Sequence, residues 1–226
     1  MLINADIGEM MGSDEEIMPF LGMGNIACGG HASNPQHMAD TVELAIQAGV
    51  KICAHPGYND RKNFGRVSVD CTKLDLLKMV EDQVTLLNEI CLQKGGVLSA
   101  IKPHGALYHD MMRDKGGARE VMLEVAKKFE AVLVVQTGGD VKWGVEVMQE
   151  VFADRGYRAD GSMLPRSEAG SLYNDAGVIV EQARKFINGD AVSAGGIDMI
   201  LKGDTVCFHG DNPASVDALK LLHSRC

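Results

Sequence analysis

The sequence predicts an α/β fold: a TIM-like parallel β/α barrel with seven strands and helices on its outside. Short apolar runs of strand length alternate with longer amphipathic runs along the whole chain, the pattern of a parallel sheet covered by helices. Titratable residues follow the C-terminal ends of six of the seven predicted strands. In a closed barrel these groups meet at one mouth, whereas an open sheet needs them only beside its switch point. The even distribution therefore favours a barrel over an open doubly wound sheet.

The predicted strands are short, and most are rich in Val and Ile, as expected for parallel strands buried on both faces. They cover residues 2–5, 25–28, 50–54, 97–101, 131–135, 151–153 and 205–208.

The predicted helices have apolar stripes at helical spacing and readable ends. Asn34-Pro35 supplies a cap and a first-turn proline, and Asn212-Pro213 does the same near the C-terminus. The stripes cover residues 38–49, 77–91, 118–129, 179–187 and 216–222. We find no internal repeat, linker or change of composition, so residues 1–226 are predicted to form one domain.

Composition excludes several classes of protein. The chain has 226 residues, 22 Lys+Arg against 31 Asp+Glu, and a net charge of −9. Because nucleic acids are held mainly by cations on phosphate, this acidic chain without a basic run is not expected to bind them. A hydrophobic content of 46% excludes disorder.

The cellular location is predicted from the lack of a membrane-spanning run and of a signal peptide in the sequence. No apolar run approaches the roughly 20 residues that span a bilayer, and the first residues carry acids in place of the basic start of a signal peptide. The six cysteines form no CxxC pair and are expected to be reduced and mostly buried. We therefore expect a cytoplasmic protein with no membrane partner.

Nucleotide motifs are weak or absent. Residues 22–27 match the GxGxxA form of the dinucleotide fingerprint, but the segment lacks the strand before it and the helix after it that the motif requires. No GxxxxGK[ST] occurs. Any ATP chemistry must therefore use another phosphate site or another subunit.

Four histidines follow predicted strands and have small or turn-forming neighbours, which lets a ligand approach the ring. They are His31, His55, His104 and His209. The other three, His37, His109 and His223, lie in helical or helix-start stretches and are expected to be solvated or capping residues.

Carboxylates accompany these histidines. Asp6 ends the first predicted strand and Glu9 follows it. Such a carboxylate can orient a histidine, ligate a metal or act as a base. Asp6, His31 and His55 together form a reasonable set for a divalent metal, although ligands on three separate strands leave no spacing to test.

Cations suited to an anionic substrate also lie beyond the strands. Lys102 follows a strand, and it is either a rim residue or a fixed charge. The two longest non-helical loops, 55–70 and 154–172, contain Arg61, Arg66, Arg155 and Arg166. These arginines are either clamps for carboxylate or phosphate, or ordinary salt-bridge partners of the abundant acids.

Taken together, the segments beyond the strands resemble the LamB/YcsF family, the A subunits of ATP-hydrolysing 5-oxoprolinase. The matching stretches are INADIGE, NIACGGHAS, AHPGYNDRKNFGR, IKPHGALY, EVFADRGYRADGSMLPRSEAG and VCFHGD, which run from the first predicted strand to the last.

The resemblance implies a seven-stranded β/α barrel similar to the glycoside hydrolase/deacetylase superfamily. It also implies a part in opening the lactam of 5-oxo-L-proline to L-glutamate with hydrolysis of ATP, with subunits B and C as partners. The family's recurrent residues fall on Asn4, Asp6, Glu9, His31, His55, Arg66, Lys102, His104, Tyr108, Asp154, Arg155, Arg166 and His209. Gly30, Met10-Met11 and a short stretch between Val135 and Glu150 depart from the family pattern, and the short stretch is expected to trim the fifth helix.

The residues suggest roles in such a reaction. We hypothesise Asp6 or His55 as base and His104 or His209 as acid. Lys102 with Arg155 or Arg66 would clamp charge, while Asn4, Glu9, Tyr108 and Arg166 would bind substrate and Asp154 would act in catalysis. Two alternatives stay open: a stand-alone metal-dependent, deacetylase-like hydrolase, and a lactam-binding subunit without chemistry of its own.

Overall fold

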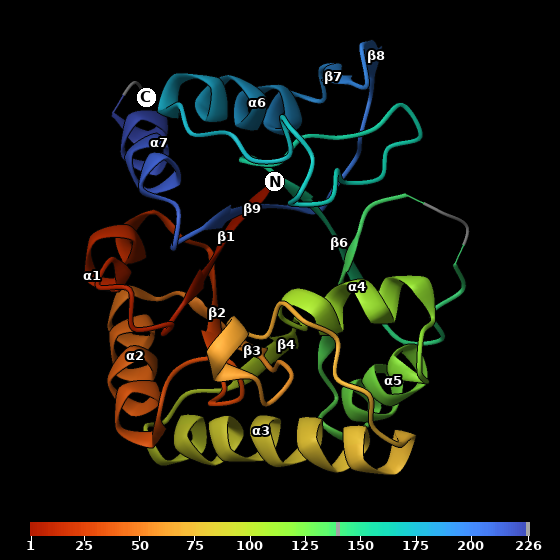
Figure 1. The fold of residues 1–226 in the computed structure, drawn as a ribbon. Helices are drawn as coiled ribbons and strands as arrows, with labels where there is room; N and C mark the ends of the chain where they lie inside the picture. The colour runs from red at the N-terminus through yellow and green to blue at the C-terminus, as the bar shows by residue number, and fades with distance from the viewer. Residues whose placement is uncertain (139–140, 225–226) are drawn as a thin grey trace.

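The computed structural model describes residues 1–138 and 141–224 and shows a closed barrel of seven parallel strands (Figure 1). The barrel strands are, in order, β1 (Leu2–Ile7), β2 (Met23–Ala27), β3 (Lys51–His55), β4 (Leu98–Ile101), β5 (Val132–Gln136), β6 (Val147–Phe152) and β9 (Thr205–His209). Strand β9 closes the barrel because it pairs in parallel with both β1 and β6. The predicted fold class is confirmed.

Helices surround this barrel, as the ribbon shows (Figure 1). They are α1 (Asp14–Ile17), α2 (Pro35–Ala48), α3 (Lys73–Gln93), α4 (Gly105–Arg113), α5 (Ala118–Lys128), α6 (Ala176–Asn188) and α7 (Pro213–His223), with short 3₁₀ turns at Met18–Phe20 and Arg61–Asn63. The five predicted helical stripes correspond to α2, α3, α5, α6 and α7. None of the helices within the described residues is both long and apolar enough to cross a membrane.

Local signals explain where these helices begin and end. The Asn34 side chain accepts a hydrogen bond from the backbone N–H of His37 at the start of α2, and Gly49 ends that helix in the left-handed conformation at φ 70°. Asp175 caps α6 in the same way, through the N–H of Val178.

Some elements differ from the prediction. Strand β6 begins at Val147, four residues before the predicted 151–153 segment, because its polar Gln149 and Glu150 interrupt the apolar run on which the prediction depended. A two-stranded antiparallel hairpin, β7 (Val192–Ala194) and β8 (Ile197–Met199), lies outside the barrel sheet and was not predicted. In the described residues between β5 and β6 there is no helix, in keeping with the shortened segment there.

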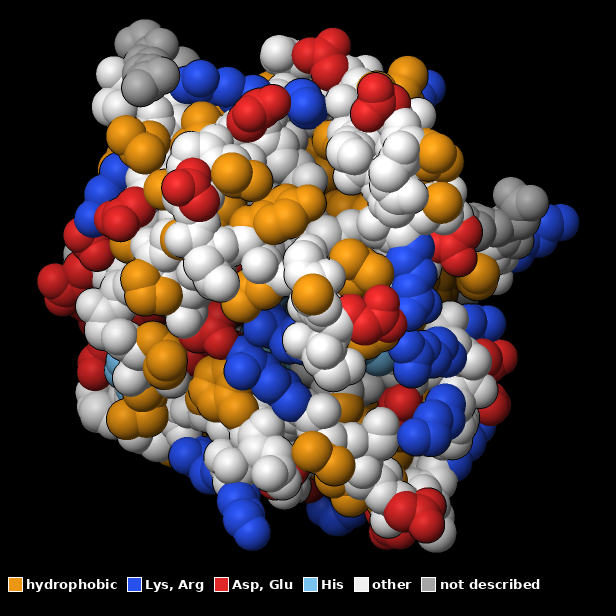
Figure 2. Space-filling view, turned by 45° about the horizontal axis from the view of Figure 1, so that its top comes forward, with side chains coloured by type: hydrophobic (Ala, Val, Ile, Leu, Met, Phe, Trp, Pro, Cys, Tyr) orange, Lys and Arg blue, Asp and Glu red, His pale blue; other side chains and the backbone are white. Residues whose placement is uncertain are grey.

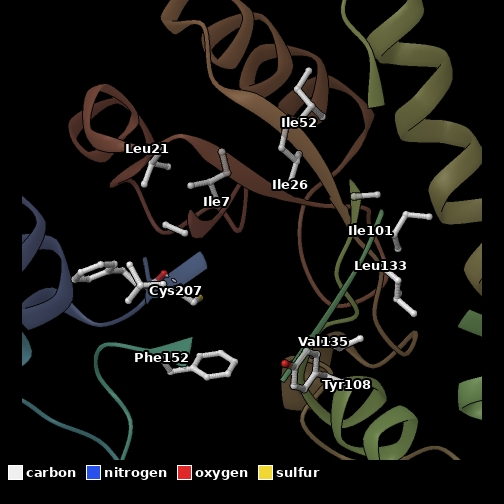
Figure 3. Close-up of a cluster of buried hydrophobic side chains, with 14 of the residues drawn as sticks. Ile7, Leu21, Ile26, Ile52, Ile101, Tyr108, Leu133, Val135, Phe152 and Cys207 are labelled. Carbon is white, nitrogen blue, oxygen red and sulfur yellow. Dashed lines mark hydrogen bonds between the residues drawn. The ribbon is translucent and has the colours of Figure 1, made fainter. Parts of the chain in front are cut away.

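Alternate residues of each strand face the helices or the barrel interior. The larger apolar cluster lies between strands and helices, and Figure 3 shows part of it, with Ile7 and Leu21 close together. A second, small cluster lies in the barrel interior and is formed by Met23 at the start of β2 with Cys53, Ala100 and Val134 from within β3, β4 and β5. This interior plug leaves the C-terminal mouth as the end that carries polar groups. The thiols of Cys28, Cys53, Cys71, Cys91 and Cys207 are free, and all but that of Cys71 are buried, while Cys226 lies outside the described residues.

A polar layer lies above the plug and fixes the floor of the mouth. The Asn4 amide donates to Thr205 Oγ1 at 2.8 Å, and the Asn25 amide donates to Asn4 Oδ1 at 2.7 Å and to Asp6 Oδ1 at 2.8 Å. All three amide and hydroxyl residues are fully buried. Because buried polar groups must be paired with one another, this network holds Asp6 in one orientation.

A buried glutamine braces the loop that follows β6. Gln182 lies on the buried face of α6, and its amide nitrogen is within 3.0 Å of the carbonyl oxygens of Phe152, Ala153 and Arg155. A single side chain thus ties the chain to α6 at the point where it leaves the barrel.

We expect Gln182→Ala to destabilise the fold by about 1–3 kcal/mol, because it leaves buried carbonyl groups without a donor. Chemical denaturation measures this change. Gln47→Ala, on the exposed face of α2, is the control and should change the free energy of unfolding by less than about 0.5 kcal/mol. Equal effects of the two substitutions would contradict a bracing role for Gln182.

Candidate active site

A cavity of about 670 Å³ opens at the C-terminal mouth of the barrel. Groups from the ends of six strands line it: Asp6, His55, Lys102 with His104, Gln136, Phe152 and His209. The loop after β6 and helix α4 form its outer wall, with Tyr108, His109, Arg113, Arg155, Arg158 and Arg166, and Arg66 reaches in from the loop after β3. The structure thus brings together residues that lie far apart in the sequence.

Lys102 forms the buried electrostatic centre of the mouth. Its ammonium donates to Asp6 Oδ1 at 2.9 Å and to Cys207 Sγ at 3.0 Å, and it lies 3.1 Å from Glu150 Oε2. Burial opposes charge on Lys102, but Asp6, Cys207 and Glu150 raise its pKa well above the usual value. Burial likewise opposes charge on Asp6, but His55 and Lys102 lower its pKa well below the usual value. Both groups are therefore ionised, and the charge of Lys102 is already used within the protein.

His209 and Asp154 form an oriented histidine–carboxylate pair. His209 Nδ1 lies 2.8 Å from Asp154 Oδ1, and Asp154 also accepts hydrogen bonds from Ser215 at 2.9 Å and Asn212 at 3.4 Å. Burial would raise the pKa of Asp154, but His209 and these donors lower it. Because Nδ1 donates to the carboxylate, Nε2 of His209 remains for the cavity, which this ring lines. Asp154 itself stands behind His209 and does not line the cavity.

Three histidines and a glutamate gather on the opposite side. His104 Nδ1 is 3.0 Å from His55 Nε2 and 3.4 Å from Glu9 Oε1, and His31 Nε2 is 3.2 Å from the same Glu9 oxygen. Burial raises the pKa of Glu9, with the charge of Asp6 adding to it. Burial lowers the pKa of His31 and of His104, and neighbouring histidines lower both further.

Asp6, His31 and His55, the set suggested for a divalent metal, are not gathered as one donor set. Asp6 Oδ2 is 3.3 Å from His55 Nε2, but His31 contacts Glu9 instead. Asp6 Oδ1 is also already hydrogen-bonded to Asn25 and Lys102. The donors that do converge are Glu9, His31, His55 and His104, whose ligand atoms lie within 4.8 Å of one another.

The outer wall of the cavity is cationic although the protein is acidic. Figure 2 shows blue Lys and Arg side chains gathered across the middle and right of this face. Arg155 is fixed by hydrogen bonds to the carbonyls of Ser171 at 2.8 Å and Leu164 at 2.6 Å, and Arg66 pairs with Asp211. Arg166 has no acidic partner within the described chain. Arg61 lies apart from this wall and donates to the Gly29 and Ser33 carbonyls.

Helix α4 contributes residues that the sequence did not single out. His109, predicted to be solvated or capping, lines the cavity together with Met112 and Arg113. Burial, together with the charges of Arg155 and Arg113, lowers the pKa of His109 to about 4. The only signal was helical spacing, because His109, Met112 and Arg113 follow one another at i, i+3 and i+4 on a helix that starts at the mouth.

Of the remaining predicted residues, Asn4, Glu9 and His31 lie behind the cavity wall, and Tyr108 lines the cavity. Asn4 belongs to the polar floor, and Glu9 and His31 stand behind His104. Tyr108 lines the cavity and meets Phe152 edge-on at 6.1 Å, and Figure 3 shows these two rings pointing toward one another. At Gly30, a Cβ would lie 2.6 Å from both the Gly57 carbonyl and Gln83, so this position has no room for a larger residue unless its neighbours move.

Fold and site together define a seven-stranded β/α-barrel protein with a cationic, histidine-lined cavity at its C-terminal mouth. The LamB/YcsF family model matches residues 1–226. The chain therefore belongs to the LamB/YcsF family.

Comparisons with individual proteins agree with the family. The chain is 39% identical over 238 residues to the A subunit of 5-oxoprolinase from Pseudomonas fluorescens (strain Pf0-1), covering 98% of this chain and 95% of that protein. The crystal structure of a "lactam utilization protein" from Thermus thermophilus matches with a TM-score of 0.90 and 31% identity, over 100% of this chain and 96% of that one. A peptidoglycan N-acetylglucosamine deacetylase matches with a TM-score of 0.52 and 14% identity, over 99% of this chain and 79% of that one, which shows likeness of fold alone.

The Asp154 carboxylate gives a pH-dependent contribution to stability. Its folded-state pKa lies below the ordinary value of 3.8, so its contribution is fully present above pH 3.8 and is lost as the pH falls toward the folded-state value. We expect Asp154→Asn to lower the free energy of unfolding at neutral pH, and the gap from the wild type to narrow on acidification. Denaturation over a pH series measures both, with exposed Asp217→Asn as control. A gap that stays constant down to pH 3 would contradict this assignment.

Proposed function

We propose that this chain is the lactam-opening subunit of an ATP-dependent 5-oxoprolinase, which converts 5-oxo-L-proline to L-glutamate. The observation that carries the proposal is one cavity lined both by His209, which Asp154 orients, and by a group of arginines. The names of the relatives support the substrate. A small anionic amide needs both features: positive charge for its carboxylate and a group that transfers protons during hydrolysis.

The chemistry defines the roles. An amide is a poor electrophile, and phosphorylation of the lactam oxygen by ATP makes attack by water favourable. Water then adds to the ring carbonyl carbon, and the C–N bond breaks as the nitrogen takes a proton. This leaves an acyl phosphate on the side-chain carboxyl group, which a second water cleaves to L-glutamate and inorganic phosphate. The site must supply a base for the water, an acid for the nitrogen and cations for the carboxylate and phosphoryl oxygens.

His209 is the best-placed proton carrier. Asp154 fixes its tautomer and leaves Nε2 toward the cavity. Asp6 is a weaker candidate for the base, because its pKa is held low by His55 and Lys102 against the effect of burial. We therefore assign proton transfer to His209.

The charge clamp falls to the arginines. Lys102 neutralises Asp6 and Glu150, so it holds the floor of the site and does not clamp a ligand. Arg155 is held rigidly by two carbonyls and faces the same cavity as Arg66 and Arg166. These three guanidinium groups are suited to carboxylate or phosphoryl oxygens.

ATP is assigned to the complete system. The chain has no P-loop, and the word "subunit" in the names of its relatives supports a complex with partners, which we take to be subunits B and C. Because ATP is consumed, we place this system in the cytoplasm.

The decisive assay measures release of ADP and glutamate from 5-oxoproline plus ATP, with this chain alone and with its B and C partners. Coupled release is expected only in the mixture, and His209→Gln should lower turnover at least about 100-fold because proton transfer is lost. His37→Gln, on α2 away from the cavity, is the control. Turnover that survives His209→Gln would favour a lactam-binding subunit without chemistry. ATP-independent hydrolysis by this chain alone would favour a deacetylase-like hydrolase.

Arg166 tests the clamp separately. Arg166→Gln should raise KM for 5-oxoproline about 10-fold or more, because it removes a guanidinium that has no acidic partner within the described chain. The assay is the same, run over a range of substrate concentrations, with Arg184→Gln on the outside of α6 as the charge-matched control. Equal KM values for the two variants would remove Arg166 from the substrate site.

A further inference from the structure

Hydrogen bonds to backbone carbonyls fix the tautomers of two cavity histidines. His55 Nδ1 lies 2.7 Å from the Lys102 carbonyl oxygen, and His104 Nε2 lies 2.8 Å from the Phe64 carbonyl oxygen. A carbonyl oxygen only accepts, so each of these nitrogens must carry a hydrogen. In the neutral rings, His55 Nε2 and His104 Nδ1 therefore hold lone pairs.

These two lone pairs point at one another. His104 Nδ1 is 3.0 Å from His55 Nε2, and the rings are nearly perpendicular, with 89° between their planes. A third acceptor, Glu9 Oε1, is 3.4 Å from the same His104 nitrogen. The two nitrogen lone pairs repel one another at this separation unless a proton or a metal ion lies between them.

We propose that Glu9, His55 and His104 bind one divalent transition-metal ion of the zinc type. Two imidazoles and a carboxylate are a usual ligand set for such ions. With metal–ligand bonds of about 2.0–2.1 Å, donors in a tetrahedral site lie roughly 3.3 Å apart. The His55–His104 separation of 3.0 Å and the Glu9–His104 separation of 3.4 Å bracket that value.

The surroundings of the three donors have the form that supports metal ligands. Ligating histidines commonly donate their other ring N–H to a carbonyl or carboxylate, and both His55 and His104 do so. Glu9 has its own partner, because His31 Nε2 lies 3.2 Å from its Oε1. Glu9 and His31 are both buried.

His31 and Asp6 are not ligands in this arrangement. The His31 ring stacks on His104 with centroids 3.7 Å apart and planes within 4° of parallel. Imidazole binds a metal in its own plane, so two stacked parallel rings cannot both direct lone pairs at one ion. Asp6 Oδ1 is engaged by Lys102 and Asn25, and Asp6 Oδ2 lies 3.3 Å from His55, but Asp6 is not in the group of donors around Glu9 whose ligand atoms all lie within 4.8 Å of one another. A second possible donor group, Asp6, Cys207 and His209, already has the Lys102 ammonium within 3.0 Å of two of its members.

The three-ligand site would keep a position open toward the cavity. His55 and His104 line the cavity, whereas Glu9 stands behind them. Three protein ligands with an open position are the mark of a catalytic ion, which lowers the pKa of a bound water to about 7. Metal binding stands independently of the proposed lactam substrate, because it rests on this chain's donors alone.

The test uses wild-type protein stripped with a chelator and titrated with Co²⁺, whose visible absorption reports a site with nitrogen ligands. We expect one equivalent to bind, to be displaced by Zn²⁺, and to bind at least about 10-fold more weakly in Glu9→Gln and His104→Ala. His37→Ala, on α2 away from the donors, is the control and should keep the wild-type affinity. Circular dichroism checks that each variant is folded.

A measurement on the wild-type protein tests the proposal without substitutions that could themselves disturb folding. Histidine ¹⁵N NMR should show His55 Nε2 and His104 Nδ1 shifting together when Zn²⁺ is added. Absence of saturable Co²⁺ binding, with a proton shared by these two nitrogens, would overturn the proposal. Binding that is lost in Asp6→Asn and kept in Glu9→Gln would equally overturn it, in favour of the set Asp6, His31 and His55.

Discussion

The mouth of this barrel depends on one buried ammonium, that of Lys102, held between two carboxylates. Asp6 and Glu150 come from strands on either side of β9, and both lie within about 3 Å of the Lys102 nitrogen. Buried charges are stable only when paired, and loss of one partner leaves the other uncompensated. The lysine therefore lets two carboxylates remain in the interior, and one of them, Asp6, lies against His55 and the cavity. The same Lys102 ion pairs therefore connect the residues that line the cavity with the strands that close the barrel.

Much of the fold could be predicted because its signals are local. Strand length, helical stripes and caps such as Asn34-Pro35 are written in neighbouring residues, and barrel closure follows from polar groups at six strand ends. The beginning of β6 could not be predicted, because Gln149 and Glu150 are polar residues of a barrel strand. A barrel strand whose inward-facing residues are polar has the sequence pattern of a loop. It can be recognised as a strand only when the partner of its polar residue on another strand, here Lys102, is known.

The sequence could predict which residues form the candidate site, but only partly how their side chains pair with one another. His55, Lys102, His104 and His209 were identified from the segments that follow strands, and the structure places all four at one cavity. The pairing of Glu9 with His31 rather than Asp6 with His31 depends on side-chain directions across three strand ends, which no spacing encodes. Gln182 and His109 were missed for a different reason. Each lies in a helix, where a polar residue reads as solvent-exposed until the neighbouring elements are placed.

The apolar plug of Met23, Cys53, Ala100 and Val134 affects how a ligand can enter and leave the barrel. It occupies the barrel interior, while the cavity opens at the C-terminal mouth. A ligand that enters by this mouth and reaches Asp6 or His55 shares the cavity with Arg66, Arg155 and Arg166. A ligand bound at these arginines therefore blocks the exit of any molecule bound deeper in the cavity.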